Sequence, residues 1–258
     1  MEENQKQLLK KFKEITKLKW VEGINNGTNS VGLTFETLLH KDIDSMYFPD
    51  YYGIEIKCTQ RFSRYPVNLF STSFDGSRLY EMNRLLKTYG RQDKKYLDKL
   101  QLQGQVYINK YNKINNNYFK LKLNQETKKL IICVYDKDLN LLEEDTYIDF
   151  ETIKLRLTLK LSNLAVVYAS KKKENEKLKF RYYKITLYKL KSFDRFIKML
   201  EQDYINVSLI GRVSRSGEEE GCQKNKNIVF SIPKELIDLL FEKELEYNAD
   251  MDNKFMIQ

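Results

Sequence analysis

The hydrophobic period of the chain changes repeatedly along its length, and this change is what most constrains the fold. Runs such as VNLFSTS (67–73) and KLIICVY (129–135) are short and rich in β-branched and aromatic residues, which is typical of strands. Between such runs, residues 3–19, 78–90 and 192–203 repeat apolar side chains with the 3.6-residue period of amphipathic helices. Short strands mixed with a few helices predict an α/β protein of the α+β type, built on mixed sheets.

The pattern of elements changes near Asp149. From there the order is helix, two strands, helix, two strands and a last helix from Pro233, and this αββαββα order is typical of a plait-like lobe. We therefore expect two lobes, 1–149 and 150–258, and leave open whether the last helix packs back on the first lobe. Because no low-complexity linker separates them, the lobes are expected to pack together.

A single histidine, His40, limits the chemistry available to the chain. Sites built on two histidines, including HExxH zinc sites, are excluded. The HKD sequence at 40–42 lacks the second copy that phospholipase-D-type nucleases use, so it predicts no site. The three cysteines, Cys58, Cys133 and Cys222, form no CxxC pair, which excludes a zinc knuckle or a disulfide framework and indicates a reducing cytoplasm.

The charge of the chain favours polyanionic partners. Among 258 residues, 45 Lys and Arg stand against 36 Asp and Glu, which gives a net charge of +9. Nucleic acid is the chief candidate, although a lysine-rich coding bias would give the same balance. No apolar run of about 18 residues is present, so we expect neither a membrane span nor a signal peptide, and we expect a cytoplasmic protein.

The segment PDYYGIEIK (49–57) carries the most specific arrangement of charges. Alternate side chains of a strand share a face, so Glu55 and Lys57 are expected to project outward together while their apolar neighbours face the core. If Gly53 permits a tight turn, Asp50 returns beside Glu55. Two carboxylates and an ammonium would then converge on one spot.

This trio suits a magnesium-dependent phosphodiesterase, because Mg²⁺ prefers oxygen ligands and keeps several waters. Asp50, Glu55 and the backbone carbonyl of Ile56 would bind Mg²⁺, with Mn²⁺ as a substitute. Lys57 would orient the attacking water or stabilise the charge on the phosphate, and Glu36, on a short helix that Thr34 is expected to cap, would add a carboxylate. The alternative is an exposed hairpin with an ordinary cross-strand ion pair, since Asp, Glu and Lys are abundant in the chain.

Three segments together resemble a known family: VGLTFETLL (31–39), PDYYGIEIKCTQR (49–61) and NLFST (68–72). They are similar to the N-terminal half of the MvaI/BcnI restriction endonucleases, relatives of the MutH mismatch-repair nuclease in the PD-(D/E)XK superfamily. The family pattern is approximately G-x-T-x-E-x-L-L, then P-D-x-x-G-x-E-[LI]-K-x-x-R, then L-F-[ST]. The positions that fit it are Gly32, Thr34, Glu36, Leu38, Leu39, Pro49, Asp50, Gly53, Glu55, Lys57, Arg61, Leu69 and Phe70. The resemblance continues through 180–200 and 211–217, so it covers most of the chain.

The resemblance implies a type II DNA endonuclease with a PD-(D/E)XK restriction-endonuclease-like catalytic core and a second, recognition lobe. Such an enzyme would act as a monomer on double-stranded DNA and leave 5′-phosphate and 3′-hydroxyl ends. Carried over, Asp50 and Glu55 are metal ligands, Lys57 is catalytic and Glu36 is a supporting acid. A cognate DNA methyltransferase would accompany the enzyme genetically rather than as a bound subunit.

Basic residues near both ends of the pattern are the candidate DNA contacts. Arg61 and Arg64 follow the catalytic strand, with surface ion pairs as the alternative, and Arg212 matches an arginine in the family's recognition segment. Three more surround a Gly/Ser loop, where plain solvation is the alternative: Arg215, Lys224 and Lys226. The chain departs from the family at Ser231, where relatives often have an arginine that follows a histidine-containing glycine loop. We therefore expect a different recognition sequence.

Two other functions are compatible with the sequence. One is a MutH-like nuclease that nicks DNA in repair, which equal cutting of both strands of an unmethylated plasmid would exclude. The other is a catalytically silent DNA-binding module. The retention of Asp50, Glu55 and Lys57 in register argues against the silent module.

Overall fold

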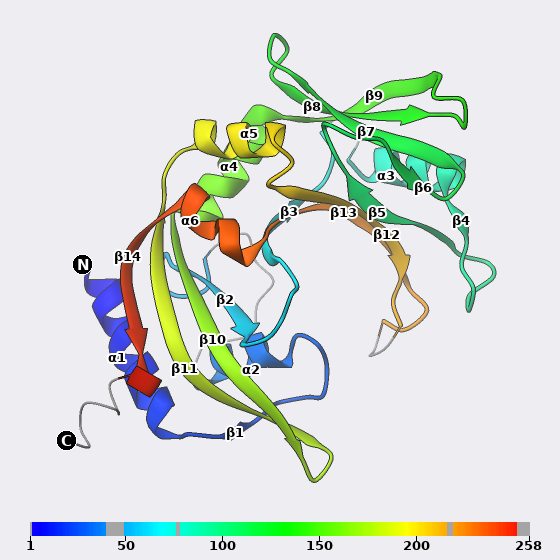
Figure 1. Ribbon diagram of the computed structural model, residues 1–258. Helices are drawn as coiled ribbons and strands as arrows, with labels where there is room; N and C mark the ends of the chain where they lie inside the picture. The colour runs from blue at the N-terminus through cyan, green and yellow to red at the C-terminus, as the bar shows by residue number, and fades with distance from the viewer. Residues whose placement is uncertain (1, 40–48, 76–77, 216–218, 252–258) are drawn as a thin grey trace. The chain divides into compact units, whose positions relative to one another are not determined.

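The structure is a computed structural model that describes residues 2–39, 49–75, 78–215 and 219–251. Within these residues the strands form two five-stranded sheets and one four-stranded sheet (Figure 1). The mixed α/β class predicted from the sequence is therefore confirmed. No helix in this part of the chain combines the length and the hydropathy that a membrane span requires.

The chain divides into two compact units, and each unit is assembled from segments far apart in the sequence. Unit 1 consists of Met1–Val67, Thr158–Ser192 and Ile237–Gln258, and unit 2 consists of Asn68–Leu157 and Phe193–Leu236. This differs from the expected division into 1–149 and 150–258. The reason is that strands from the second half of the chain complete the sheet begun by the first half.

Unit 1 is built on a mixed five-stranded sheet with the order β1-β11-β10-β2, in which β14 also pairs with β11. Strands β10 and β11 form a long antiparallel hairpin, whereas β10 and β2 are parallel. The elements of this unit are α1 (Glu3–Lys17), β1 (Val21–Glu22), α2 (Ser30–Leu38), β2 (Glu55–Gln60), β10 (Asn163–Glu174), β11 (Lys177–Leu190), α6 (Ile237–Leu240) and β14 (Phe241–Asn248). As the end of this order, β2 is an edge strand in the described part of the sheet.

Helices α1 and α2 bury their apolar stripes against one face of this sheet (Figure 1). Leu8, Phe12 and Ile15 recur at helical spacing on α1 and are almost fully buried. They join Phe35 of α2 and the inward side chains of β2, β10 and β11 in one apolar cluster. This cluster fixes which face of β2 is turned away from it, and that face carries the charged residues.

Unit 2 contains a five-stranded sheet with the order β3-β13-β12-β5-β4 and a four-stranded antiparallel sheet with the order β6-β7-β8-β9. Its strands are β3 (Val67–Thr72), β4 (Arg91–Gln92), β5 (Leu100–Val106), β6 (Asn112–Ile114), β7 (Asn117–Asn124), β8 (Lys129–Tyr135), β9 (Leu141–Asp149), β12 (Asn206–Val213) and β13 (Gln223–Ile232). Its helices are α3 (Arg78–Tyr89), α5 (Phe193–Glu201), the 3-10 turn η1 (Lys234–Leu236) and most of α4 (Phe150–Leu161). Phe70, Phe196 and Phe230 pack against one another in its core, and the rings of Phe70 and Phe230 are stacked 4.8 Å apart.

The αββαββα order expected after Asp149 is present, but its two hairpins belong to different sheets: β10–β11 to unit 1 and β12–β13 to unit 2. The predicted last helix is only the short α6, and a strand that was not predicted, β14, follows it. Thr34 does not cap α2, which begins at Ser30. Its hydroxyl instead accepts a hydrogen bond from the Ile24 N–H at 3.1 Å and holds the preceding loop.

Candidate active site

A two-residue turn places Asp50 against strand β2. Tyr51 and Ile54 exchange backbone hydrogen bonds of 2.9 and 2.8 Å, and the two residues between them, Tyr52 and Gly53, have φ of 44° and 85°. Positive φ at both central positions is the type I′ geometry that matches the twist of paired strands. No heavy atom lies within 4 Å of the place where a Gly53 Cβ would be, so glycine serves the backbone conformation there and not a close contact.

The turn brings Asp50 beside the start of β2, as the sequence predicted. Asp50 Oδ2 accepts a hydrogen bond of 2.9 Å from the backbone N–H of Ile56. The side chains of Ile54 and Ile56 are buried in the apolar cluster of unit 1, so Glu55 and Lys57 share the opposite face. In the parallel pair, Glu55 lies opposite Leu164 and Lys57 opposite Val166 of β10.

Glu55 is buried, contrary to the expectation that the charged residues of this strand project outward. Its exposed fraction is 0%, whereas the Lys57 side chain is 25% exposed. Oε1 of Glu55 pairs with the Lys57 ammonium, but Oε2 is buried without a hydrogen-bond partner among the described residues. A buried carboxylate oxygen without a donor is costly, so this oxygen is the atom in the site that most needs a ligand.

The electrostatic surroundings of Glu55 oppose its ionisation. Burial raises the pKa of its carboxyl above the usual range, and the charge of Asp50 raises it further, while Lys57 and Lys160 lower it. Because desolvation is the largest cause, the carboxylate would gain from a cation that replaces the lost hydration.

Lys160 is a member of the site that the sequence did not indicate. It lies near the end of α4, and its ammonium is 3.4 Å from Glu55 Oε1. Lys160 comes shortly before β10, the strand that pairs with β2, and this pairing explains its position. Nothing in the local pattern around residue 160 indicates that pairing, so no sequence signal could have identified it.

Glu36 lies on α2, which packs against β2, and it is partly buried. The charges of Glu36 and Asp50 both raise the pKa of the Cys58 thiol, after burial as the main cause. Glu36 and Asp50 thus both act on the electrostatic environment of Cys58. Within the described ranges, however, no three His, Cys, Asp or Glu side chains are grouped closely enough to hold a metal.

The predicted DNA contacts nearest to the site are exposed. Arg61 and Arg64 follow β2 directly, and both have solvent-exposed side chains. The Arg61 guanidinium lies 5.5 Å from the ring centre of Tyr183 and 5.7 Å from that of Phe62. Cation–π contacts of this kind hold Arg61 in place while leaving its charge accessible.

In unit 2 the predicted DNA contacts lie in different environments. Arg212 on β12 is exposed, as a DNA contact requires. Arg215 instead makes a two-pronged ion pair with the buried carboxylate of Asp93. Ser231 is only 5% exposed, so it does not present the DNA-contacting surface that its alignment position suggested. The side chains of Lys224 and Lys226, like His40, lie outside the described residues.

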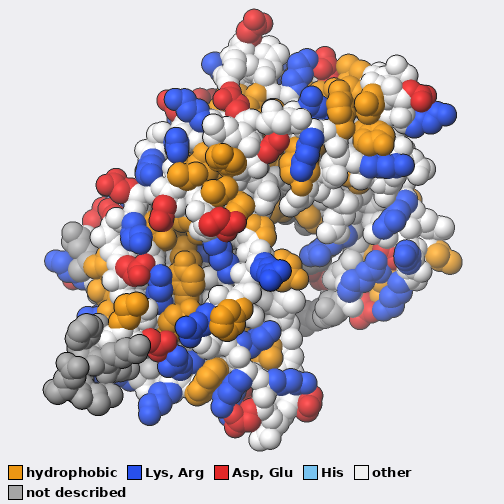
Figure 2. All heavy atoms as spheres, in the orientation of Figure 1, with side chains coloured by type: hydrophobic (Ala, Val, Ile, Leu, Met, Phe, Trp, Pro, Cys, Tyr) orange, Lys and Arg blue, Asp and Glu red, His pale blue; other side chains and the backbone are white. Residues whose placement is uncertain are grey.

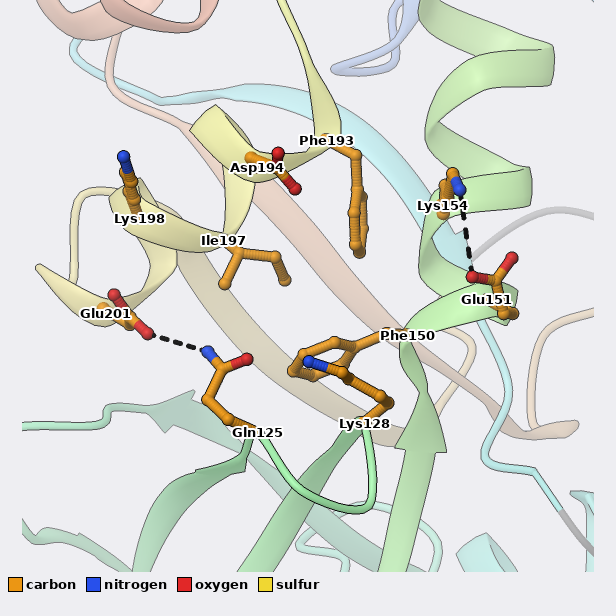
Figure 3. A pocket seen from close by; sticks show the side chains of 10 residues that line it. All are labelled: Gln125, Lys128, Phe150, Glu151, Lys154, Phe193, Asp194, Ile197, Lys198 and Glu201. Carbon is orange, nitrogen blue, oxygen red and sulfur yellow. Dashed lines mark hydrogen bonds and ion pairs between the residues drawn. The ribbon is translucent and has the colours of Figure 1, made fainter.

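Unit 2 also contains a pocket of about 470 Å³ between the β7–β8 turn, the start of α4 and helix α5 (Figure 3). Its apolar side chains are Phe150, Phe193 and Ile197. The polar side chains around it have both signs of charge. Two pairs of them interact with each other: Glu151 with Lys154, and Gln125 with Glu201. None of its lining residues belongs to the predicted site, and the pocket shows no convergent catalytic set.

Charge alone does not mark a binding face. Figure 2 shows lysine and arginine side chains interspersed with acidic ones over much of the visible surface. The local arrangement at β2 is more informative. Strand β2 carries Glu-x-Lys, and the tight turn before it follows Pro49 and Asp50. This arrangement is that of the PD-(D/E)XK class of nucleases.

Comparisons with known proteins identify the group within this class. The model of the MvaI/BcnI restriction endonuclease family matches residues 9–241. A solved complex of the restriction endonuclease MvaI with its cognate DNA substrate aligns over 95% of this chain and 98% of its own, with 26% identity and a TM-score of 0.88. MvaI in the absence of DNA aligns over the same shares with 27% identity and a TM-score of 0.59. No curated protein sequence matches the chain.

The chain belongs to the MvaI/BcnI restriction endonuclease family. Its enzyme class is that of the site-specific deoxyribonucleases, which are hydrolases.

Proposed function

We propose that the protein is a magnesium-dependent type II restriction endonuclease that hydrolyses phosphodiester bonds at a specific sequence in double-stranded DNA. The observation that carries the proposal is the buried Oε2 atom of Glu55, which has no partner in the described chain and lies in a carboxyl group flanked by Asp50 and Lys57. The family match and the likeness to a DNA-bound MvaI support DNA as the substrate.

The residues of the site fit a divalent cation. An oxygen ligand set suits Mg²⁺ rather than a metal that prefers nitrogen or sulfur. Asp50 and Glu55, with the carbonyl of Ile56, would hold the ion, and the unsatisfied Glu55 oxygen would gain its missing partner. Two carboxylates leave positions for water and for a phosphate oxygen, which is how Mg²⁺ is commonly bound at phosphoryl-transfer sites.

The rest of the chemistry would come from the two lysines beside Glu55. A bound Mg²⁺ would neutralise charge on the phosphate and acidify a water molecule. Lys57, which is partly exposed and paired with Glu55, would orient the attacking water or stabilise the charge that develops on the phosphate. Lys160 adds a second positive charge on the same side of Glu55.

The proposed products are those that the family resemblance implies. Attack of water on phosphorus in line with the 3′ oxygen would break the P–O3′ bond and leave a 5′-phosphate and a 3′-hydroxyl. Unit 1 is the catalytic part because it contains Asp50, Glu55 and Lys57, and unit 2, with Arg212, is the main DNA-recognition part. The proposal includes a monomeric, cytoplasmic enzyme accompanied by a separate DNA methyltransferase.

The test is cleavage of unmethylated plasmid or phage DNA with Mg²⁺, with EDTA, and by the Lys57→Ala protein. Discrete fragments that disappear in the last two reactions are expected. Lys6→Ala is the matched control, because Lys6 forms an exposed ion pair with Glu3 on α1 and its loss should leave cleavage unchanged. Binding of DNA without any magnesium-dependent cleavage would overturn the proposal.

Sequencing the fragment ends would give the recognition sequence, the cut position and the chemistry of the ends. Cutting of both strands at equal rates would support the restriction enzyme. Cutting of one strand alone would favour a MutH-like nicking nuclease instead.

A further inference from the structure

The loop between β2 and β3 presents two aromatic rings to solvent. Phe62 is 88% exposed and Tyr65 is 82% exposed, the two highest values among the large apolar side chains that the structure describes. Burying a phenylalanine side chain removes a large apolar surface from water and stabilises a folded protein. Unit 1 does not bury Phe62, so this stabilisation is still available from a binding partner that covers the ring.

The loop is held in a defined conformation rather than hanging free. The backbone N–H of Arg61 donates to the Ala169 carbonyl at 2.9 Å, and that of Ser63 donates to the Gln60 carbonyl at 3.1 Å. The Tyr65 N–H donates to the Ser63 hydroxyl at 3.3 Å. Rings displayed by a braced loop lose little conformational entropy on binding, which favours their use as anchors.

The charges of the same loop indicate the kind of partner. The sequence alternates arginine and aromatic residues, and Arg61 and Arg64 are both exposed. A partner complementary to these two arginines and two aromatic rings would carry negative charge and flat apolar faces. Nucleic acid bases and their phosphates have both properties.

The position of the loop brings the rings close to the site of cleavage. Loop and site belong to the same unit, and Arg61 lies four residues after Lys57, directly after the end of β2. At about 3.3 Å per residue this separation is ~13 Å. The major groove of B-DNA is about 12 Å wide and the minor groove about 6 Å, so a duplex whose phosphate lies beside Lys57 presents its neighbouring base pairs to this loop.

We propose that Phe62 and Tyr65 form an aromatic wedge that stacks on bases of the bound duplex beside the scissile phosphate, while Arg61 and Arg64 bind the flanking phosphates. The inference rests on the proposed function, because it takes DNA as the ligand. A wedge between base steps distorts the duplex, and the energy of that distortion depends on sequence. The loop would thus add discrimination at base pairs that unit 2 need not contact.

Tryptophan fluorescence tests the wedge directly, because the chain has a single tryptophan, Trp20. In a Trp20→Phe background, the Phe62→Trp protein is mixed with a plasmid fragment that carries a cut site, with Ca²⁺ in place of Mg²⁺. Stacking on bases should quench the emission by about half or more and should protect the indole from acrylamide. The matched control is Leu18→Trp in the same background, since Leu18 is 54% exposed at the end of α1 and its emission should not change.

The outcomes separate the wedge from the proposed function. A mobility shift of the fragment without any change at the Phe62→Trp position overturns the wedge alone. Absence of any mobility shift overturns both the wedge and the proposed function.

Salt dependence provides a second measurement. The Phe62→Ala/Tyr65→Ala protein should lose about tenfold or more in DNA affinity for each ring, with an unchanged slope of log K against log salt concentration. The Arg61→Ala/Arg64→Ala protein should reduce that slope by about 2, because two phosphate contacts are lost. The conservative Phe62→Tyr change should keep the affinity. Equal reductions of the slope by both double substitutions would mean that the rings act only by positioning the arginines, and would overturn the wedge.

Discussion

Glu55 in unit 1 and Asp93 in unit 2 are both buried carboxylates, but the two units surround them differently. Asp93 is 1% exposed and accepts hydrogen bonds from the Arg215 guanidinium and from the backbone N–H groups of Lys95 and Tyr96. The Arg215 contact is the main cause that holds the pKa of Asp93 well below its usual range. Glu55 has two lysines at one oxygen and, among the described residues, no hydrogen-bond partner at the other, and burial holds its pKa above the usual range.

These surroundings indicate that the Asp93 carboxylate has a structural role and that the Glu55 carboxylate is available to a ligand. Each donor around Asp93 favours the ionised form in the folded state, so the fold gains stability from it. The ionised form of Glu55 is disfavoured by the fold itself. We expect the two sites to respond in opposite ways when the carboxylate is made neutral.

The largest expected effect is that of Glu55→Gln. Cleavage should fall by about 10³-fold or more, because several kcal/mol of transition-state stabilisation depend on the ion held there. Without metal, the variant should be more stable by roughly 1 kcal/mol, since a buried charge with an unsatisfied oxygen is removed. Cleavage kinetics and thermal melting in EDTA measure the two effects, and Glu22→Gln, in an exposed ion pair with Lys177, is the control. Melting of Glu55→Gln at a clearly lower temperature than the wild type would contradict the comparison.

Neutralising the Asp93 carboxylate should lower the stability of the protein, the opposite of the effect at Glu55. Asp93→Asn should lower the melting temperature by several degrees and weaken the backbone hydrogen bonds of Ser214 and Gly221, because Arg215 loses its partner. Hydrogen exchange at these two amides, which donate to the Cys222 and Ser214 carbonyls at 2.9 and 3.0 Å, reports the change. Arg215→Ala should reproduce the result, whereas Asp98→Asn, at an exposed pair, should not. If Arg215→Ala weakens DNA binding but leaves stability intact, Arg215 contacts DNA and the structural role is wrong.

Lys160→Met should have a smaller effect on cleavage, roughly a tenfold loss at saturating Mg²⁺, because one partly screened charge near the phosphate is removed. The pKa of Glu55 should rise further, since Lys160 is one of the groups that lower it. The acidic limb of the pH–rate profile should therefore move to higher pH. Lys154→Met, on the same helix, is the matched control. Identical profiles for the two variants would remove Lys160 from the site.

The smallest effect concerns the pH dependence of stability, and its sign differs between the sites. The pKa of Glu55 is raised from 4.5, so its favourable contribution is complete below pH 4.5 and is lost as the pH rises through the folded-state value. The pKa of Asp93 is lowered from 3.8, so its contribution is present above pH 3.8 and is lost as the pH falls through the folded-state value. Urea midpoints between pH 3 and 7 should show the advantage of Glu55→Gln growing above pH 4.5 and the deficit of Asp93→Asn shrinking below pH 3.8. Parallel curves for the two variants would contradict the distinction.

The local part of the site was predictable from the sequence because local interactions determine it. Gly53 between two strand patterns predicted the turn, and the alternation around Ile54 and Ile56 predicted which side chains share a face. The turn geometry and the Asp50–Ile56 hydrogen bond confirm the first expectation, and the burial of Ile54 and Ile56 in one apolar cluster confirms the second. The motif also predicted the family, which the matched family model confirms.

The parts that failed depend on distant partners. The burial of Glu55 and the presence of Lys160 follow from the parallel pairing of β2 with β10, which no local pattern encodes. The buried partner of Arg215 is Asp93, more than a hundred residues away. Strand β14 was missed because FEKELEYN is rich in helix-forming Glu, Lys and Leu, and its pairing with β11 overrides that propensity.

The pairing of β2 with β10 also has a consequence for the newly made protein. Residues 55–60 must wait for residues 164–169 before their strand has its neighbour. A ribosome that adds about 5–20 residues per second needs ~5–20 s to cover that interval. An unfinished chain that ends before β10 therefore carries Asp50, Glu55 and Lys57 without the sheet that aligns them. Nascent and truncated copies are expected to be harmless to the DNA of the cell that makes them.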